Sequence, residues 1–418
     1  MTKILILGGG FGGVRAALDL EKKLGDRGDV EITLVDKNDS QTFFPSLYEV
    51  ASIYGIDHQH PFHTKLRGTV SIPFSDIFKN KKINLIQAEI NHLDIQNKHV
   101  VTSNGATLDF DYLVLALGSV VSTFGVPGAD EYAFKFKTIE DGLMLNDKIE
   151  ELYIEASEKK RPLPINILIG GAGFNGVELA AELSNCTVHI ACSHKITQQN
   201  CSAIALVEAG PAILPMISGK ERDLIQKRLE KLGINLLVNS PIQEIGPDFI
   251  KLKNGNYLKG DLIIWSGGVK ALDIFRTVDS LELDDRGRIF VNEFLQTKNY
   301  PNIFAVGDNI VFIDPKTQKP IPQMAFLAIE QGRVTAENIA RIINGSSELK
   351  KHKPAYDVWI IPVGGKNAVV HLGKFTFSGF FGYLLREFVD LRYFLTILPF
   401  FKALKIFFRG VTVFSKND

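Results

Sequence analysis

The stretch KILILGGGFGG, residues 3–13, decides the fold of this chain. Its apolar run, residues 4–7, predicts a strand buried on both faces of a parallel sheet. Three glycines follow in the spacing G-x-G-x-x-G, namely Gly8, Gly10 and Gly13. In a dinucleotide-binding turn these glycines permit the tight turn, the approach of a pyrophosphate and close helix packing, respectively. Residues 14–24 have the apolar spacing of a helix, whose N-terminal N–H groups can bind phosphates.

The same arrangement occurs a second time. Residues 165–169 predict another short buried strand, and a helix is expected over residues 177–183. Between them lie three glycines in the same spacing, Gly171, Gly173 and Gly176. One dinucleotide needs one such turn, so the sequence predicts two dinucleotides held by one chain.

Each glycine turn has an acidic partner at the end of the next apolar run. Asp36 follows residues 31–35, and Glu208 follows residues 205–207. A carboxylate at this place accepts hydrogen bonds from ribose hydroxyls. Glu208 should also repel a 2′-phosphate, which favours NADH over NADPH.

Composition sets the class of protein. The chain has 418 residues, which predicts two or three domains. Its formal net charge is zero, which gives no reason to expect a nucleic-acid partner. Its three cysteines argue against a secreted disulfide scaffold. None lies in residues 40–52, so the dithiol mechanism of disulfide reductases is excluded, whereas the aromatic character of this stretch suits a wall beside a flavin ring.

Later stretches complete the predicted nucleotide lobes. Residues 110–119 predict a buried strand ending in Ala116 and Gly118, where the chain crosses to the second lobe. A strand over residues 303–306 should return to the first lobe and place Gly307 and Asp308 beside a flavin ribityl chain. The helix expected over residues 325–343 can direct its N-terminus at the flavin ring.

Two groups of potential metal ligands are interpreted as structural. Residues 54–69 contain His58, His60 and His63 and predict an exposed loop, because the spacing fits no zinc site. Residues 185–202 are expected to form a surface excursion, and no C-x-x-C pair occurs there. This second group comprises Cys186, His189, Cys192, His194 and Cys201. We therefore predict no metal.

Taken in order, these motifs resemble those of type II NADH dehydrogenases, single-subunit flavoproteins that are similar to sulfide:quinone oxidoreductases. The resemblance rests on both glycine turns and Asp36, on Ala116-x-Gly118, and on Val177-Glu178-Leu179-Ala180. Trp265-x-x-Gly268 and Ala305-Val306-Gly307-Asp308 complete it. It implies an α/β fold with two Rossmann-like dinucleotide-binding domains and a C-terminal amphipathic helical membrane-anchoring segment. The domains expected are 1–120 with 296–345 for FAD, 121–295 for NADH, and 346–418 for the membrane.

The resemblance also implies an activity. Hydride would pass from NADH to FAD, and electrons would then reduce a membrane quinone, menaquinone or ubiquinone, without proton pumping. The enzyme would be peripheral, on the cytoplasmic face of the cell membrane, and the family suggests a homodimer. Further flavin contacts are expected at Phe11, Gly12, Lys37, Pro45, Ile90, Met324 and Ala325, and a further NADH contact at Gly268.

Three residues are candidates for catalysis. Glu178 matches a family glutamate between the nicotinamide and quinone pockets, where a carboxylate with a raised pKa can handle protons. The alternative is a surface acid near the nucleotide. The family's quinone helix reads Ala-Gln-x-Ala-x-Gln-x-Gly, whereas this chain has Phe326 and Glu330 at the glutamine positions. The hydrogen-bond donors expected for a quinone carbonyl are then missing or moved to Gln323 or Gln331. Glu330 and Gln331 are the catalytic candidates beside Glu178.

The C-terminal tail is rich in aromatic residues, yet charges interrupt every run of about 18 apolar residues, so a spanning helix is not expected. Two amphipathic helices are expected in its place. Leu384, Phe388, Leu391 and Leu395 share one face, opposite Arg386 and Asp390. After Pro399, three basic residues line up at helical spacing and should meet anionic lipid: Lys402, Lys405 and Arg409. The alternative is a core or dimer helix.

Two other functions remain open. Sulfide:quinone oxidoreductase chemistry needs cysteines beside the flavin, and all three cysteines lie in residues 185–202. A redox-sensing flavoprotein that has lost quinone activity is suggested by Phe326 and Glu330.

Overall fold

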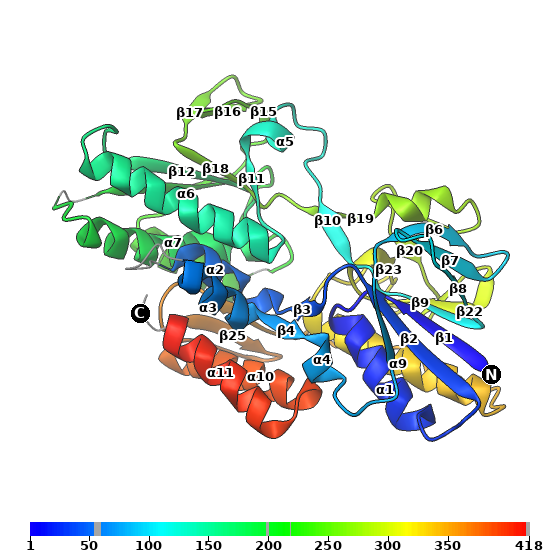
Figure 1. The fold of residues 1–418 in the computed structure, drawn as a ribbon. Coiled ribbons are helices and arrows are strands. Elements are labelled where there is room, and N and C mark those ends of the chain that lie inside the picture. Colours follow the sequence, from blue (N-terminus) through cyan, green and yellow to red (C-terminus); the bar gives the residue numbers. More distant parts are fainter. Residues whose placement is uncertain (54–59, 198–199, 218, 415–418) are drawn as a thin grey trace.

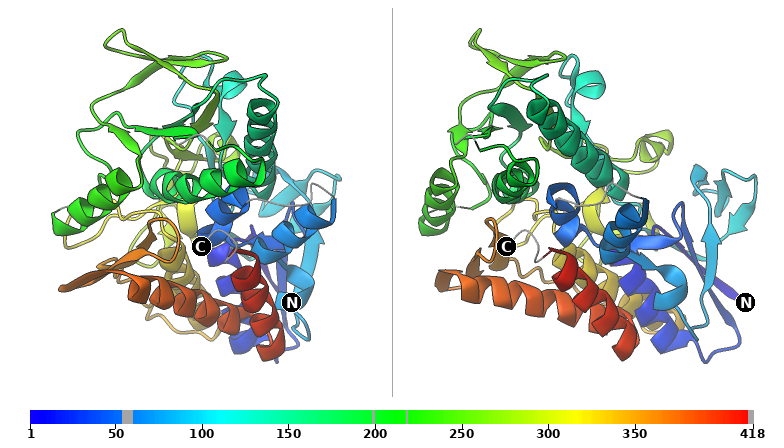
Figure 2. Two further views of the ribbon diagram at one scale, coloured as in Figure 1. Left: turned by 90° about the vertical axis from the view of Figure 1, so that its left-hand side faces the viewer. Right: turned by 60° about the vertical axis from the view of Figure 1, so that its left-hand side comes forward.

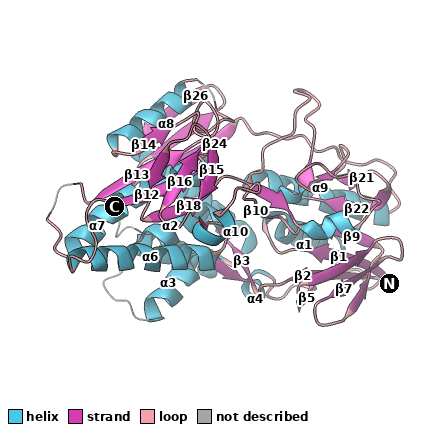
Figure 3. Cartoon of the chain, turned by 90° about the horizontal axis from the view of Figure 1, so that it is seen from above, coloured by secondary structure: helices cyan, strands magenta, loops and turns pink. Residues whose placement is uncertain are grey.

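The computed structural model describes residues 1–53, 60–197, 200–217 and 219–414. Two lobes lie side by side, each built on its own parallel sheet (Figure 1). They are joined by β10 (Ser119–Val121) and β19 (Val269–Ala271), which pair antiparallel. Seen from above, the two sheets occupy opposite ends of the molecule (Figure 3). The predicted two-lobed α/β class is therefore confirmed.

The first lobe has a six-stranded sheet in the order β21-β22-β9-β1-β2-β5. The apolar run that opens the chain forms β1 at its centre, with Ile4 opposite Ile32 on one side and Tyr112 on the other. In this order β22, from near residue 300, lies beside β9, which comes from the first part of the chain. The strands are β1 (Thr2–Leu7), β2 (Val30–Asp36), β5 (Asn84–Gln87), β9 (Tyr112–Leu115), β21 (Gln296–Thr297) and β22 (Tyr300–Ala305).

Two helices of this lobe pack unusually closely: α1 (Phe11–Leu24) and α9 (Ala325–Ile343). A Cβ at Gly332 of α9 would lie 2.4 Å from the Gly12 carbonyl oxygen.

The smaller elements include an antiparallel sheet, β6 (Ile90–Asp94), β7 (His99–Thr102) and β8 (Thr107–Asp109), and the pairs β3 (Ser40–Thr42) with β4 (Ser71–Pro73) and β20 (Ile289–Phe290) with β23 (Ile310–Val311). Short helices are η1 (Phe44–Ser46), α2 (Leu47–Ser52), α3 (His60–Val70), α4 (Phe74–Ile77), η2 (Asp273–Thr277) and η3 (Gly307–Asn309).

The second lobe repeats the plan with a five-stranded sheet in the order β11-β18-β12-β13-β14. The second apolar run forms β12 at its centre. The strands are β11 (Phe134–Lys135), β12 (Ile165–Gly170), β13 (Ser202–Val207), β14 (Asn235–Leu237) and β18 (Leu262–Trp265). Its helices are α5 (Ala129–Tyr132), α6 (Ile139–Ser157), α7 (Phe174–Ser193) and α8 (Lys220–Lys231), and a small sheet comprises β15 (Ile242–Ile245), β16 (Phe249–Leu252) and β17 (Tyr257–Lys259).

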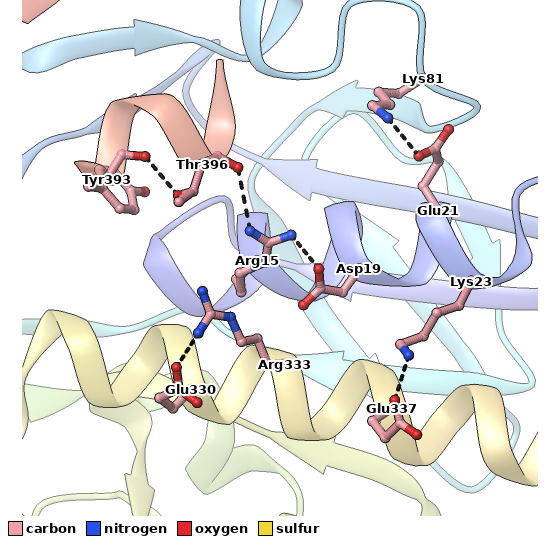
Figure 4. Close-up of polar contacts among 10 residues, drawn as sticks. All are labelled: Arg15, Asp19, Glu21, Lys23, Lys81, Glu330, Arg333, Glu337, Tyr393 and Thr396. Carbon is pink, nitrogen blue, oxygen red and sulfur yellow. Dashed lines mark hydrogen bonds and ion pairs between the residues drawn. The ribbon is translucent and has the colours of Figure 1, made fainter. Parts of the chain in front are cut away.

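The C-terminal region contacts both lobes (Figure 2). A three-stranded sheet of β24 (Val358–Pro362), β25 (Ala368–Leu372) and β26 (Phe375–Gly379) leads into α10 (Phe380–Ile397) and α11 (Phe400–Phe414). Arg228 of α8 donates to the Val363 carbonyl at 3.1 Å, which ties this region to the second lobe. Arg15 of α1 donates to the Thr396 carbonyl at 3.5 Å, which ties it to the first (Figure 4).

Several predicted elements are corrected. Residues 60–70 form helix α3 and not a loop, while His58 lies outside the described residues. The predicted surface excursion is mostly helix, because α7 continues to Ser193 and buries Cys186 and Ile190. No group of three potential metal ligands occurs in the described ranges.

Candidate active site

The first glycine of each turn lies against a crossing strand. Gly8 has φ +103° and Gly171 has φ +106°, a region that L side chains rarely adopt. A Cβ at Gly8 would lie 2.3 Å from the Ala116 carbonyl oxygen, and one at Gly171 would lie 2.6 Å from Gly267 Cα. Steric exclusion therefore explains both glycines independently of any ligand.

The second and third glycines differ from the first in a consistent way. A Cβ at Gly10 or Gly173 would meet nothing within 4 Å, so both positions border open space. Those at Gly13 and Gly176 would lie 1.9 Å and 2.0 Å from the carbonyl oxygen of the first glycine in their own turn. Each turn is thus closed toward its helix and open at the place where a pyrophosphate would approach.

The two acidic partners hold their turns by equivalent hydrogen bonds. Asp36 Oδ2 accepts from Gly9 N at 2.6 Å, and its other oxygen accepts from Asn38 N at 2.8 Å. Glu208 Oε2 accepts from Ala172 N at 2.9 Å, and its other oxygen accepts from Gly210 N at 2.8 Å. Burial raises the pKa of Asp36, opposed by the backbone hydrogen bonds from Asn38 and Gly9. Each carboxylate keeps unused lone pairs for ribose hydroxyls.

Four of the long helices that the structure describes begin without a side-chain cap and without an acidic residue in the first turn: α1, α7, α9 and α10. Helix α6 is different, because Thr138 and Asp141 form a complete capping box there. Uncapped N-termini present N–H donors and a partial positive charge, which suits anionic ligands. Helices α1 and α7 follow the glycine turns, α9 begins at Ala325, after Met324, and α10 belongs to the C-terminal region.

Residues from both predicted motifs of the flavin site meet at Asp308. Its Oδ2 accepts from Ser119 Oγ at 2.8 Å and lies 3.3 Å from Lys137 Nζ. Beside it, Asn309 Oδ1 accepts from Gly118 N at 3.1 Å. Lys137 was missed from sequence, because a lone lysine before a helix carries no signal of its own. It also lies 4.8 Å from the centre of the Phe44 ring.

The other expected flavin contacts are distributed around the first lobe. Phe11 begins α1 and lies 5.0 Å from the Tyr393 ring. A Cβ at Gly12 would lie 2.8 Å from Val306 Cγ2. Lys37 is exposed after β2, Pro45 lies in η1, and Ile90 begins β6.

The start of α9 gives the predicted quinone contacts definite partners. Gln331 is buried, and its Oε1 accepts from Gly307 N at 2.7 Å. Gln323 Nε2 donates to the Asp308 carbonyl. Glu330 is exposed and forms an ion pair with Arg333 on the same helix (Figure 4). Gln331 and Gln323 therefore support the backbone at Gly307 and Asp308, and the catalytic roles of Glu330 and Gln331 stay predictions.

Glu178 lies half-buried on α7, where burial raises its pKa from 4.5 to about 8. The Arg386 guanidinium opposes this shift and Asp390 adds to it. Burial likewise raises the pKa of Asp390 to about 7. A carboxyl that is protonated near neutral pH, close to both nucleotide lobes, can donate or accept a proton.

Arg386 is the residue that sequence reasoning placed least well. It was predicted only to lie opposite the apolar face of its helix, whereas the structure buries it in contact with the wall expected beside the flavin. Its Nη2 donates to Ser46 Oγ at 2.8 Å and to the Pro45 carbonyl at 3.2 Å. Its Nη1 lies 3.3 Å from Glu49 Oε1. No local pattern could identify Glu49 as a partner 337 residues away.

Two nucleotide cradles of the same geometry in one chain define a two-dinucleotide oxidoreductase, and residues 2–332 match the family model described as pyridine nucleotide-disulphide oxidoreductase. The chain is also 32% identical over 384 residues to the Type II NADH:quinone oxidoreductase of Staphylococcus aureus strain MSSA476, a match that covers 88% of this chain and 92% of that protein. The chain belongs to the type II NADH:quinone oxidoreductases. The predicted family is confirmed.

Solved structures share the fold. NDH2 from Plasmodium falciparum, determined in complex with NADH, has a TM-score of 0.81 at 18% identity and covers 98% of this chain and 97% of that one. The sulfide:quinone oxidoreductase of Aquifex aeolicus has a TM-score of 0.77 at 20% identity and covers 98% and 96%. At these identities the likeness supports the architecture alone.

Proposed function

We propose that this protein oxidises NADH through bound FAD and passes the electrons to a membrane quinone. The observation that carries the proposal is the repeated cradle: two glycine turns with matching contacts, each with an acid at the same place, in a chain of this family. One cradle serves the flavin nucleotide and the other serves NADH.

The first lobe fits FAD. Gly10 borders the open space where the pyrophosphate would lie, Asp36 would hold the adenosine ribose, and Asp308 would accept a ribityl hydroxyl. Lys137 Nζ, 3.3 Å from Asp308 Oδ2, orients this carboxylate. When bound, FAD accepts a hydride from NADH and returns electrons to a quinone.

The second lobe fits NADH. Gly173 provides the open approach, and Glu208 would accept hydrogen bonds from the two ribose hydroxyls. A 2′-phosphate at that place would face a carboxylate already fixed by two backbone N–H groups, so NADPH is disfavoured. Gly268 follows β18, and its Cβ would lie 2.7 Å from Phe124 Cζ, so this position requires glycine.

Glu178 serves as the proton-handling residue in this proposal. Its burial keeps the carboxyl protonated near neutral pH, while Arg386 limits how far the pKa rises. Quinone reduction consumes protons. A neutral carboxyl in a half-buried place can supply one, and before the transfer it carries no unpaired charge.

The C-terminal helices support a peripheral membrane location. None of the helices in the described ranges is long and apolar enough to cross a membrane. Large apolar side chains of α10 and α11 are nevertheless exposed, among them Phe381, Phe388, Phe401 and Phe408. A protein that reduces a lipid-soluble quinone needs such a face at the bilayer, on the cytoplasmic side where NADH is available.

The test is anaerobic reduction followed by turnover. Addition of NADH to the purified yellow protein should bleach the flavin absorbance, and a menaquinone or ubiquinone analogue should restore it. Absence of bleaching would refute the proposal. Bleaching without turnover on either analogue would instead support the redox-sensing alternative, and would leave the two-nucleotide assignment intact.

The sulfide alternative has less support from the positions of the thiols. Cys186 and Cys201 are buried in the second lobe, and Cys192 is exposed near the end of α7. Replacement of all three cysteines should leave NADH:quinone turnover unchanged.

A further inference from the structure

A lysine of the second lobe reaches a carboxylate of the first. Lys137 follows β11 and precedes α6, whereas Asp308 lies in η3, after β22 has returned to the first lobe. Lys137 Nζ donates to Ser119 Oγ at 3.0 Å and lies 3.3 Å from Asp308 Oδ2. Ser119, the first residue of β10, donates to the same carboxylate oxygen at 2.8 Å. Three segments that are far apart in the sequence therefore meet at one carboxylate.

The backbone that carries Lys137 is held in place. Asp141 Oδ2 accepts from Lys137 N at 2.9 Å and from Thr138 N at 2.7 Å, within the capping box of α6. Helix α6 in turn packs on α2 of the first lobe (Figure 1), where a Cβ at Gly142 would lie 3.3 Å from Val50 Cγ1. The side chain thus starts from a position that is fixed relative to both lobes, which reduces the conformational freedom lost when it meets its partners.

The ammonium group of Lys137 is already engaged by the protein. Its side chain is only 17% exposed, and besides Ser119 and Asp308 its Nζ lies 4.8 Å from the centre of the Phe44 ring. A cation over an aromatic face is attracted by the ring quadrupole. Phe44 belongs to residues 40–52, the aromatic stretch expected beside the flavin. An ammonium has three donors, so with these three partners it suits the orientation of other groups better than direct capture of a substrate.

The two oxygens of Asp308 have different surroundings. Oδ2 accepts from Ser119 and is paired with Lys137, while no hydrogen bond reaches Oδ1 from the residues that the structure describes. Next along the chain, Asn309 Oδ1 accepts from Gly118 N, and a Cβ at Gly118 would meet nothing within 4 Å. Lys137 and Ser119 thus fix one carboxylate oxygen and leave the other for a ligand hydroxyl.

We propose that Lys137 is a positioning residue for FAD, supplied to the first lobe by the second. By holding Asp308 Oδ2, its ammonium keeps the carboxylate in the rotamer that presents Oδ1 to a ribityl hydroxyl, and it thereby slows release of the flavin. The inference rests on the proposed function and adds that the flavin site is incomplete without a residue of the NADH lobe. FAD supplies the redox chemistry when bound, and Lys137 acts on its retention.

A contact that only fastened the two lobes together would resemble the other ion pairs of α6. Glu140 of α6 pairs with Arg67 of α3 at 2.7 Å, and their side chains are 60% and 48% exposed. Exposed pairs contribute little to stability, because water and salt screen them. The Asp308 side chain is 29% exposed, and one of its oxygens is shared by two donors, which favours a role in orienting that carboxylate.

The rate at which FAD leaves the holoprotein tests the inference. Dilution of the purified protein allows release, and the rise in flavin fluorescence follows it. Lys137→Met should release FAD about tenfold faster than the wild type, because a charge-assisted hydrogen bond to Asp308 is lost. Lys137→Arg keeps the charge and the donors and should recover most of the difference. Lys137→Gln keeps a donor without the charge, should fall between them, and serves if Lys137→Met does not fold.

The matched control removes a cation from another ion pair of α6. Arg67→Met breaks the exposed pair with Glu140 and should release FAD at the wild-type rate. Equal acceleration in Arg67→Met and Lys137→Met would assign the effect to loosened packing between the lobes and overturn the inference.

A double-mutant cycle shows whether Lys137 acts through the carboxylate. Asp308→Asn should itself release FAD faster, and adding Lys137→Met to it should change the rate by less than about twofold. If the full effect of Lys137→Met persists in the Asp308→Asn background, Lys137 acts by another route and the inference is wrong.

Failure of this inference is distinguishable from failure of the proposed function. If the wild type and Lys137→Met release FAD equally slowly and both bleach with NADH, only the role of Lys137 fails. If NADH bleaches neither protein, the proposed electron transfer fails, while a difference between their release rates would still support the role of Lys137.

Discussion

Replacement of Glu178 by glutamine should change how the stability of the protein depends on pH. In the folded protein the pKa of this carboxyl is raised from 4.5 to about 8. Between these values the folded state holds a proton that the unfolded state has released. Stability therefore falls as pH rises through this interval, by about 1.4 kcal/mol per pH unit. Glutamine keeps the shape and removes the titration.

The magnitude follows from the size of the interval. Between about pH 5.5 and about pH 7.5, wild type should lose about 3 kcal/mol relative to Glu178→Gln, as an upper bound, because water penetration and relaxation around Arg386 reduce the penalty. Asp390 and the other titrating groups remain in both proteins, so the difference isolates Glu178. Denaturant unfolding of both proteins across this range measures it.

The control for loss of one negative charge is Glu330→Gln, an exposed residue in the first lobe. Its stability should track the wild type across the same pH range. A difference between wild type and Glu178→Gln that stays constant with pH would refute the reasoning. The variant Glu178→Gln should also keep flavin reduction by NADH while losing quinone turnover, since the Glu178 carboxyl is proposed to donate or accept protons.

Three further perturbations address other parts of the molecule. Gly8→Ala should yield colourless protein, because its Cβ would lie 2.3 Å from the Ala116 carbonyl oxygen. Gly171→Ala should stay yellow and show a raised KM for NADH. Visible spectra and steady-state rates distinguish the two variants. Gly332→Ala should destabilise the α1–α9 contact by about 1–3 kcal/mol, measured by thermal unfolding, and an unchanged melting temperature would contradict that close contact. The pKa of His371 is raised by Asp357, 2.9 Å away, and by Glu221 of α8, 3.1 Å away, so its stabilisation is complete below its ordinary value of 6.5 and is lost as pH rises through the folded value. His371→Asn should therefore lose stability in mild acid and much less in alkali, and equal losses at both would exclude this ion pairing.

Much of the fold was accessible from local sequence. Both glycine turns, both acidic partners and helix α9 follow from short-range patterns, because backbone sterics and apolar spacing act over a few residues. The family of the chain followed from the order of these motifs. The length of α7 was not accessible, since residues such as Cys186 and Ile190 are buried only by the completed lobe.

The site was less predictable where it depends on distant contacts. Lys137, Asp308 and Ser119 meet only after the chain has crossed between the lobes and returned. The apolar rows of α10 and α11 could be read from spacing. The inward orientation of Lys402 and Arg409 could not, because it depends on Asp76 and the Gly68 carbonyl in a separate part of the chain.

The uncapped N-termini of α1, α7 and α9 have a practical consequence for the bench. Each offers N–H donors to any oxyanion, and sulfate or phosphate from a buffer has the same chemistry as the nucleotide phosphates. Of the three, α7 belongs to the cradle that must exchange its ligand in every turnover. Assays in phosphate should therefore report weaker NADH affinity than assays in a zwitterionic buffer of equal ionic strength, and crystals grown from sulfate should show that ion at the start of α7.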